Sequence, residues 1–259
     1  MKIKDTVHFQ WYKSFFIVFI ILVCFLASAT LTEASFYEVF ENLDQAVAFL
    51  EELSRPDFSY LPKLVDPMIK TLKMSALGSL IGVIFAIPVS FLATTVVTKN
   101  VIITQLFRLI LNIVRTIPNL LLAALLVAIL GIGDATGVVT IAIFTFGMVS
   151  QLIYETIETI DMAPIEAAES VGANKLQIAV WSVWPQVMLN VLSYFFYAFE
   201  INVRASVVLG YVGAGGIGVT LSNALGLFKY DRASLIIITI FIVVLIIDSL
   251  SEAIRRRIE

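Results

Sequence analysis

Glu200, Asn202 and Arg204 stand near the end of a long apolar run, where polar side chains are unexpected. Residues four positions apart share one face of a helix, so the Glu200 carboxylate and the Arg204 guanidinium can neutralise each other. Charges inside a membrane span are costly unless they are paired or face water. One interpretation is a packing pair. We favour the other, in which Arg204 and Asn202 border a pathway and offer positive charge and hydrogen-bond donors to an anion.

A glycine-rich loop follows this run. It contains Gly213, Gly215, Gly216 and Gly218, a spacing that formally matches the dinucleotide-binding fingerprint. That motif needs a preceding strand and an acidic residue about 20 positions further on, whereas these glycines follow an apolar span. We therefore expect no nucleotide site here. We expect a tight turn of re-entrant form, because irregular backbone is tolerated where it lines a cavity, and we assign it to an outer gate.

The third feature is a polar segment, residues 161–186, between two long apolar runs. Pro164 suits the first turn of a helix, and Gly172 suits the position just beyond its end. A helix of about two turns between them would be a rigid body that a soluble partner could push. The alternative is a plain helical turn that joins two spans. The side chains that this helix would offer are the small Ala167 and Ala168 and the charged Glu166 and Glu169.

The composition is that of an integral membrane protein. Of 259 residues, 59% are hydrophobic and 14% charged, whereas a soluble domain usually carries about 25% charged residues. The net charge of −3 provides no basic surface for nucleic acid. His8 is the only histidine and Cys24 the only cysteine, which excludes an intrachain disulfide and a histidine-based metal site or triad. We expect a chain that is not an enzyme and binds neither a cofactor nor nucleic acid.

An apolar run must hold about 20 residues to cross a hydrocarbon core of about 30 Å. Six runs approach this length and predict an all-α membrane protein with about six transmembrane helices. They cover residues 14–32, 74–98, 116–133, 135–154, 186–209 and 233–254. In the second run Gly78 and Gly82 permit close helix packing. The first run also resembles a cleaved signal peptide, but we expect it to be retained as a span.

Basic residues near the outermost spans place both termini in the cytoplasm. They are Lys2, Lys4 and Lys13 before the first span and Arg255, Arg256 and Arg257 after the last. This orientation makes residues 159–185 a cytoplasmic loop and puts the glycine-rich loop outside. The expected organisation is a cytoplasmic tail (1–13), a first transmembrane helix (14–32), an extracytoplasmic amphipathic segment (33–67) and a transmembrane domain (68–259).

Two further segments are amphipathic. In residues 102–114 polar side chains recur at helical spacing opposite aliphatic ones, which predicts a helix in the cytoplasmic interface. In residues 36–53 acidic side chains lie opposite an apolar face. We expect this second segment along the outer membrane surface, and a solvated hairpin or a contact with a partner is the alternative.

The polar segment resembles the EAA loop of ABC-importer permeases, whose pattern is Glu-Ala-Ala, three residues, Gly, nine residues, Ile-x-Leu-Pro. Ser182 and Trp184 stand where that pattern has Ile and Leu. The resemblance implies a coupling helix that docks in a groove of an ATPase subunit. The residues that fall on the pattern are Glu166, Ala167, Ala168, Gly172 and Pro185.

Residues 199–218 closely resemble the signature of phosphonate ABC-importer permeases, as do residues 115–118 and 171–175. The similarity extends from about Thr71 to Arg257. It implies a type I, methionine-importer-like permease fold, a homodimer in the cell membrane, and a partner dimer of ATPase subunits that binds the ATP. It also implies an extracytoplasmic binding protein that selects phosphonate, phosphite or a related oxyanion.

Three alternatives stay open. The first is an ABC permease for another solute, such as methionine. The second is an ion-coupled secondary transporter, although such proteins tend to carry internal inverted repeats with broken helices, and we see none. The third is a membrane-embedded enzyme, which the shortage of histidine and cysteine disfavours.

Overall fold

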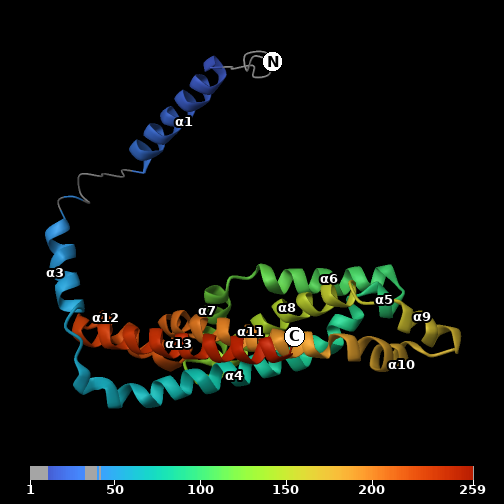
Figure 1. Ribbon diagram of the computed structural model, residues 1–259. Helices are drawn as coiled ribbons and strands as arrows, with labels where there is room; N and C mark the ends of the chain where they lie inside the picture. Colours follow the sequence, from blue (N-terminus) through green and yellow to red (C-terminus); the bar gives the residue numbers. More distant parts are fainter. Residues whose placement is uncertain (1–10, 33–39, 41, 259) are drawn as a thin grey trace. The chain divides into compact units, whose positions relative to one another are not determined.

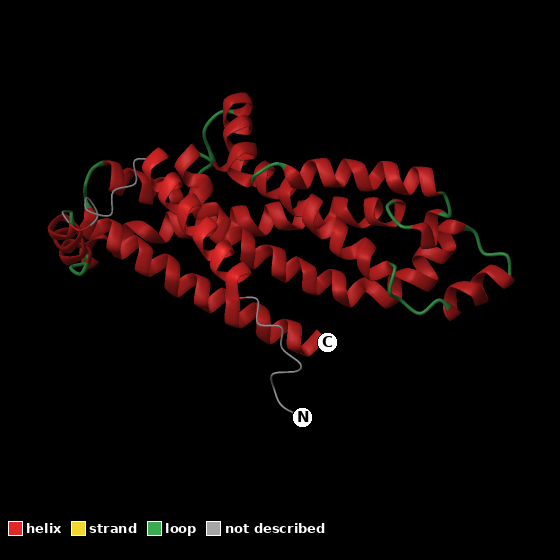
Figure 2. Cartoon of the chain, turned by 90° about the horizontal axis from the view of Figure 1, so that it is seen from above, coloured by secondary structure: helices red, strands yellow, loops and turns green. Residues whose placement is uncertain are grey.

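The computed structural model describes residues 11–32, 40 and 42–258, and every regular element in these ranges is a helix (Figure 1, Figure 2). The chain divides into two units, residues 1–52 and 53–259. This division lies earlier than the expected boundary at residue 68. Each unit is therefore described by itself.

The described residues of the first unit include the two helices α1 and α3. α1, Trp11–Leu31, is an apolar helix of 21 residues with no buried side chain, as expected for a span that faces lipid. α3, Leu43–Leu53, is amphipathic and forms the second half of the predicted amphipathic segment. Residues 36–39 and 41 of that segment, and residues 1–10 of the predicted tail, lie outside the described residues.

The second unit is a helical bundle built around two long helices, α4 (Leu61–Leu92) and α8 (Asp134–Ile157). Their backbones approach closely because α4 places glycines at the contact. A Cβ atom on Gly78 would lie 2.6 Å from the Cγ2 atom of Ile141, and one on Gly82 would lie 2.6 Å from the Cβ atom of Thr145. The predicted close packing of this span is confirmed, and α4 begins at Leu61 rather than at the expected 74.

The remaining helices surround this pair. Figure 1 shows α9 and α10 at one end of the bundle and α12 at the other. The elements are η2 (Phe58–Tyr60), α5 (Thr95–Thr98), α6 (Val101–Thr116), α7 (Asn119–Leu130), α9 (Ala163–Ser170), α10 (Lys175–Gln177), the π-helical η3 (Ile178–Val183), α11 (Trp184–Leu209), η4 (Gly210–Val212), α12 (Gly216–Gly226) and α13 (Tyr230–Ile258).

The expected third span, residues 116–133, is not one straight helix. α6 and α7 meet at an angle of 87°, because Ile117 precedes Pro118 and adopts an extended conformation. α7 has 12 residues and a length of about 18 Å, too short to cross a bilayer alone. Among the described residues, five helices are long and apolar enough to span, and a sixth if the bent pair counts as one.

Candidate functional site

The predicted short helix in the polar segment is present. α9 is eight residues long, carries Pro164 in its first turn, and is followed by Gly172 at φ +83°. That φ lies in the left-handed region, which favours glycine. Ile165 is buried against the bundle, whereas Glu166 and Ala167 are exposed. Ala168 is half-buried and packs against the same core cluster as Ile165, so α9 is anchored by two apolar side chains and presents Glu166 and Ala167 outward.

Hydrogen bonds fasten α9 and the residues just before it to η3 and to the start of α11. The Ser182 hydroxyl donates to the Pro164 carbonyl at 3.2 Å. Gln186 accepts from the Asp161 N–H at 3.2 Å and donates to its carbonyl at 3.3 Å. Ser182, one of the two departures from the EAA pattern, thus contributes a polar contact that an isoleucine could not make. Pro185 stands in the first turn of α11 beside these contacts and is exposed.

Two lysines connect the polar segment to the end of α5. Lys99 forms an ion pair with Glu169 of α9, and the Lys175 ammonium donates to the Thr98 carbonyl at 2.6 Å. The polar segment is thus held both through α11 and through the turn after α5. These contacts hold α9 in a fixed position against the rest of the bundle.

Arg108 of α6 makes a further set of contacts near this end of the bundle. Its Nε atom donates to the Ala93 carbonyl at 2.8 Å, its guanidinium pairs with Glu158 at the end of α8, and it lies 4.8 Å from the centre of the Tyr154 ring. The sequence marked Arg108 only as one polar residue of an amphipathic helix. In the structure this side chain holds the bent α6 against the bundle.

The predicted pair of Glu200 and Arg204 forms and belongs to a larger charge cluster. Arg204 also donates to Asp248 at 3.2 Å, and Arg255 donates to Glu200 at 3.3 Å. Glu200 is 8% exposed and Arg204 is 51% exposed. Two carboxylates and two guanidiniums therefore balance, and α13 is joined to α11. Sequence reasoning missed this link, although Asp248 and Arg255 lie seven residues apart, close to two helical turns, and so share a face.

Asn202 lies on another side of α11. It is fully buried, and its amide nitrogen donates to the Ser79 hydroxyl at 2.8 Å and to the Thr145 hydroxyl at 2.7 Å. The structure does not bring Asn202 together with Arg204. α11 instead has a polar interior contact with α4 and α8, and a charged contact with α13.

The glycine-rich loop takes the backbone conformations that glycine permits. Gly213, Gly215 and Gly216 have φ values of +84°, +86° and +71°. The preceding element is a helix and not a strand, so the dinucleotide interpretation fails on geometry. After the loop, Gly218 lies in α12 so close to Gly210 that an added Cβ would be 2.9 Å from the Gly210 Cα and 2.1 Å from the Val207 carbonyl oxygen.

The loop is tied to the two central helices. The Gly216 N–H donates to the Asp134 carboxylate at 3.1 Å, and the Ile217 N–H donates to the Thr71 hydroxyl at 2.7 Å. The Gly133 N–H donates to the Gly213 carbonyl at 3.0 Å. The start of α8, the first third of α4 and the loop after α11 therefore meet at the end of the bundle opposite α9.

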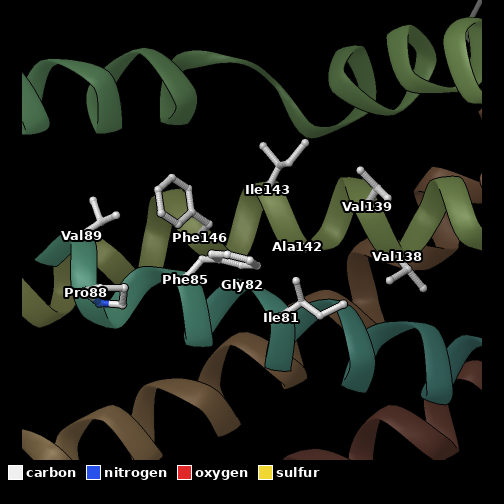
Figure 3. A pocket seen from close by; sticks show the side chains of 10 residues that line it. All are labelled: Ile81, Gly82, Phe85, Pro88, Val89, Val138, Val139, Ala142, Ile143 and Phe146. Carbon is white, nitrogen blue, oxygen red and sulfur yellow. The ribbon is translucent and has the colours of Figure 1, made fainter.

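A cavity of about 480 Å³ lies along the contact between α4 and α8. Figure 3 shows its lining, which consists of apolar side chains and one glycine. It offers no charged or hydrogen-bonding side chain, so it lacks the donors that an oxyanion requires. The lining residues are Ile81, Gly82, Phe85, Pro88, Val89, Val138, Val139, Ala142, Ile143 and Phe146.

Comparison with known families identifies the class of protein that this fold and these elements define. The family model described as "Binding-protein-dependent transport system inner membrane component" matches residues 78–259. This match covers most of the bundle, including α9, the charge cluster and the glycine-rich loop. The chain belongs to this family.

Among curated proteins the chain is similar to the phosphite transport system permease protein PtxC of Stutzerimonas stutzeri. The two are 36% identical over 205 residues, which are 79% of this chain and 74% of that protein. It is 35% identical over 216 residues to the phosphate-import permease protein PhnE of Mycolicibacterium smegmatis, covering 83% of this chain and 41% of that protein. A probable D-methionine permease, MetI of Vibrio cholerae, is 27% identical over 202 residues, 73% of this chain and 89% of that protein.

Solved structures establish the fold. A chain of the MetNI methionine ABC transporter in an inward-facing conformation matches with a TM-score of 0.68 at 21% identity, covering 78% of this chain and 99% of that one. A chain of an amino acid ABC transporter matches with a TM-score of 0.63 at 20% identity, covering 77% and 95%. The predicted type I ABC-importer permease fold is confirmed.

Proposed function

We propose that this chain is the permease subunit of an ATP-binding-cassette importer for phosphonate, phosphite or a related phosphorus oxyanion. The observation that carries the substrate class is the 36% identity over 79% of the chain to a permease named for phosphite transport. The weaker likeness to a methionine permease, 27% identical, keeps methionine as the rival solute.

The proposed assembly contains two copies of this chain in the cell membrane, with both termini in the cytoplasm. Each α9 docks on one subunit of an ATPase dimer through the outward face that carries Glu166 and Ala167, with the half-buried Ala168 at its edge. ATP is bound and hydrolysed by those partners, and this chain supplies no catalytic residue. A binding protein docks on the outer face near the glycine-rich loop and delivers the solute.

A continuous path of helix supports the coupling role of α9. Ser182 of η3 holds the α9 backbone, and η3 runs directly into α11. α11 has 26 residues, a rise of about 39 Å, and ends at the glycine-rich loop. A displacement of α9 by a partner would therefore reach the opposite end of the bundle through one stiff element, and alternating access needs such a link.

The charge cluster suits transient binding of an anion. The exposed half of Arg204 can donate to an oxyanion, but Glu200 and Asp248 already occupy part of the guanidinium. An arriving anion must compete with these carboxylates, so its affinity for the pathway stays low and release stays possible. Tight selection is then the task of the binding protein.

ATP-driven uptake in proteoliposomes tests this function. The chain is reconstituted with the ATPase and binding-protein subunits that co-purify with it, and uptake of labelled phosphite is measured against competing methylphosphonate, phosphate and methionine. We expect competition by the phosphorus oxyanions and none by methionine. Competition by methionine alone would reassign the solute, and uptake that persists without the ATPase would indicate a secondary transporter.

A further inference from the structure

A second cavity, of about 850 Å³, lies at the α9 end of the bundle. It is formed by the last turns of α4, by α5, by the start of α6 and by the stretch from α10 to the start of α11. We call it the α4–α10 groove. Its walls are mainly apolar and include Phe91, Ile103, Leu176, Val180 and Trp184, with Lys175 as the only charged lining residue. Pockets of about 300–1,000 Å³ accommodate organic ligands.

Lys175 carries a charge that no carboxylate balances. Its ammonium donates one hydrogen bond, to the neutral Thr98 carbonyl at 2.6 Å, and forms no ion pair with the residues that the structure describes. Lys99 differs, because Glu169 neutralises it. An ammonium has three donors, so Lys175 keeps hydrogen-bonding capacity as well as net charge beside the apolar groove.

The groove lies beside the end of α4, a candidate membrane span. α4 ends at Leu92, and after the short α5 comes the polar turn containing Lys99 and Asn100. Leu176 is 73% exposed, so an apolar wall of the groove opens to the surroundings rather than to the core. Trp184 adds an amphipathic ring of the type enriched at membrane interfaces. An apolar slot below an unbalanced cation matches a phospholipid with an anionic headgroup.

We propose that the α4–α10 groove binds one anionic phospholipid, with an acyl chain between α4 and η3 and the headgroup phosphate on Lys175. Basic pockets between transmembrane helices recognise anionic headgroups in this way. The bound lipid would bridge α4 and α5 to the polar segment that carries α9. This proposal concerns lipid binding alone and does not depend on the identity of the transported solute.

Trp184 provides a reporter inside the groove. The chain has three tryptophans, so the double variant Trp11→Phe, Trp181→Phe leaves Trp184 as the only one. The full chain is placed in phosphatidylcholine nanodiscs that contain the same small fraction of brominated phosphatidylglycerol or brominated phosphatidylcholine. Bromine on the acyl chain quenches a neighbouring indole. We expect stronger quenching from the anionic lipid, with an apparent affinity about fivefold higher.

Variants of Lys175 test whether its charge causes the preference for the anionic lipid. Lys175→Gln should abolish the preference for the anionic lipid, and Lys175→Arg should retain it. Lys73→Gln is the matched control, because it removes a lysine from an exposed position earlier on α4 and should change nothing. Equal quenching by both lipids, or a preference that survives in Lys175→Gln, would overturn the proposal. So would an absence of quenching by either lipid, which would mean that protein, such as a second copy of the chain, covers the groove.

Discussion

Arg255, near the end of α13, donates to Glu200 in the middle of α11 at 3.3 Å. Glu200 is almost fully buried and also pairs with Arg204, so one carboxylate holds two guanidiniums from different helices. The last helix is thereby fixed to the helix that carries the candidate site. A charge cluster that is already neutral in total stabilises this helix contact, and it leaves only the exposed part of Arg204 for a ligand.

Replacing the central carboxylate should loosen this contact. We expect Glu200→Gln to lower the free energy of unfolding by about 2 kcal/mol, because two charged hydrogen bonds lose their acceptor charge at a buried position. Glu252→Gln is the matched control, since Glu252 pairs with Arg256 at an exposed position, and its cost should stay within about 1 kcal/mol. Thermal unfolding of both variants in the same detergent measures the two effects. Equal decreases in unfolding temperature would contradict the central role of Glu200 in the cluster.

Arg204 should matter for transport beyond its share in the contact between α11 and α13. Arg204→Ala is expected to reduce ATP-driven uptake at least tenfold, and Arg204→Lys should not restore it, because an ammonium lacks the planar fork that can serve two carboxylates and an anion. Arg256→Ala removes an exposed arginine of α13 and should leave uptake unchanged, although the amounts of protein in the membrane must match. Normal uptake in Arg204→Ala would make this residue a packing residue only.

The turn after α9 gives a prediction about coupling. Gly172→Leu should uncouple ATP hydrolysis from uptake while the protein remains in the membrane. Open space surrounds Gly172, so a leucine side chain would meet no clash there. The substitution is unfavourable because residue 172 has a φ of +83°, and a residue with a Cβ atom adopts this conformation at a cost of about 1–2 kcal/mol. Gly226→Leu, in equally open space without a positive φ, is the control. Uptake per ATP hydrolysed is the quantity to measure, and an unchanged ratio in Gly172→Leu would contradict the role assigned to α9.

Features that depend on residues close together in the sequence were predictable. The helix between Pro164 and Gly172 follows from two residues with strong backbone preferences, and the pair of Glu200 and Arg204 follows from helical spacing alone. The bend before α7 carried a local signal in Pro118, but the uncharged and mostly apolar character of residues 116–133 concealed it.

Features that depend on packing between helices were not predictable. Nothing near Asp248 in the sequence shows that it faces Arg204 across 44 positions. The direction of Asn202 likewise depends on which side of α11 meets Ser79, and that is decided by how α4 and α11 pack. Both polar contacts lie in apolar helices with weak amphipathic patterns, so periodicity could not orient them.

The contact between Gly218 and Gly210 gives the last prediction. A methyl group at residue 218 would lie 2.1 Å from the Val207 carbonyl oxygen, and backbone on both sides cannot move away as a flexible side chain could. We therefore expect Gly218→Ala to separate α12 from the end of α11 and to lower the unfolding temperature by several degrees, since overpacking costs about 1–3 kcal/mol. Gly226→Ala, in the same helix with open space around it, should be neutral. A Gly218→Ala protein as stable as Gly226→Ala would show that α12 does not pack on α11 as closely as the structure places it.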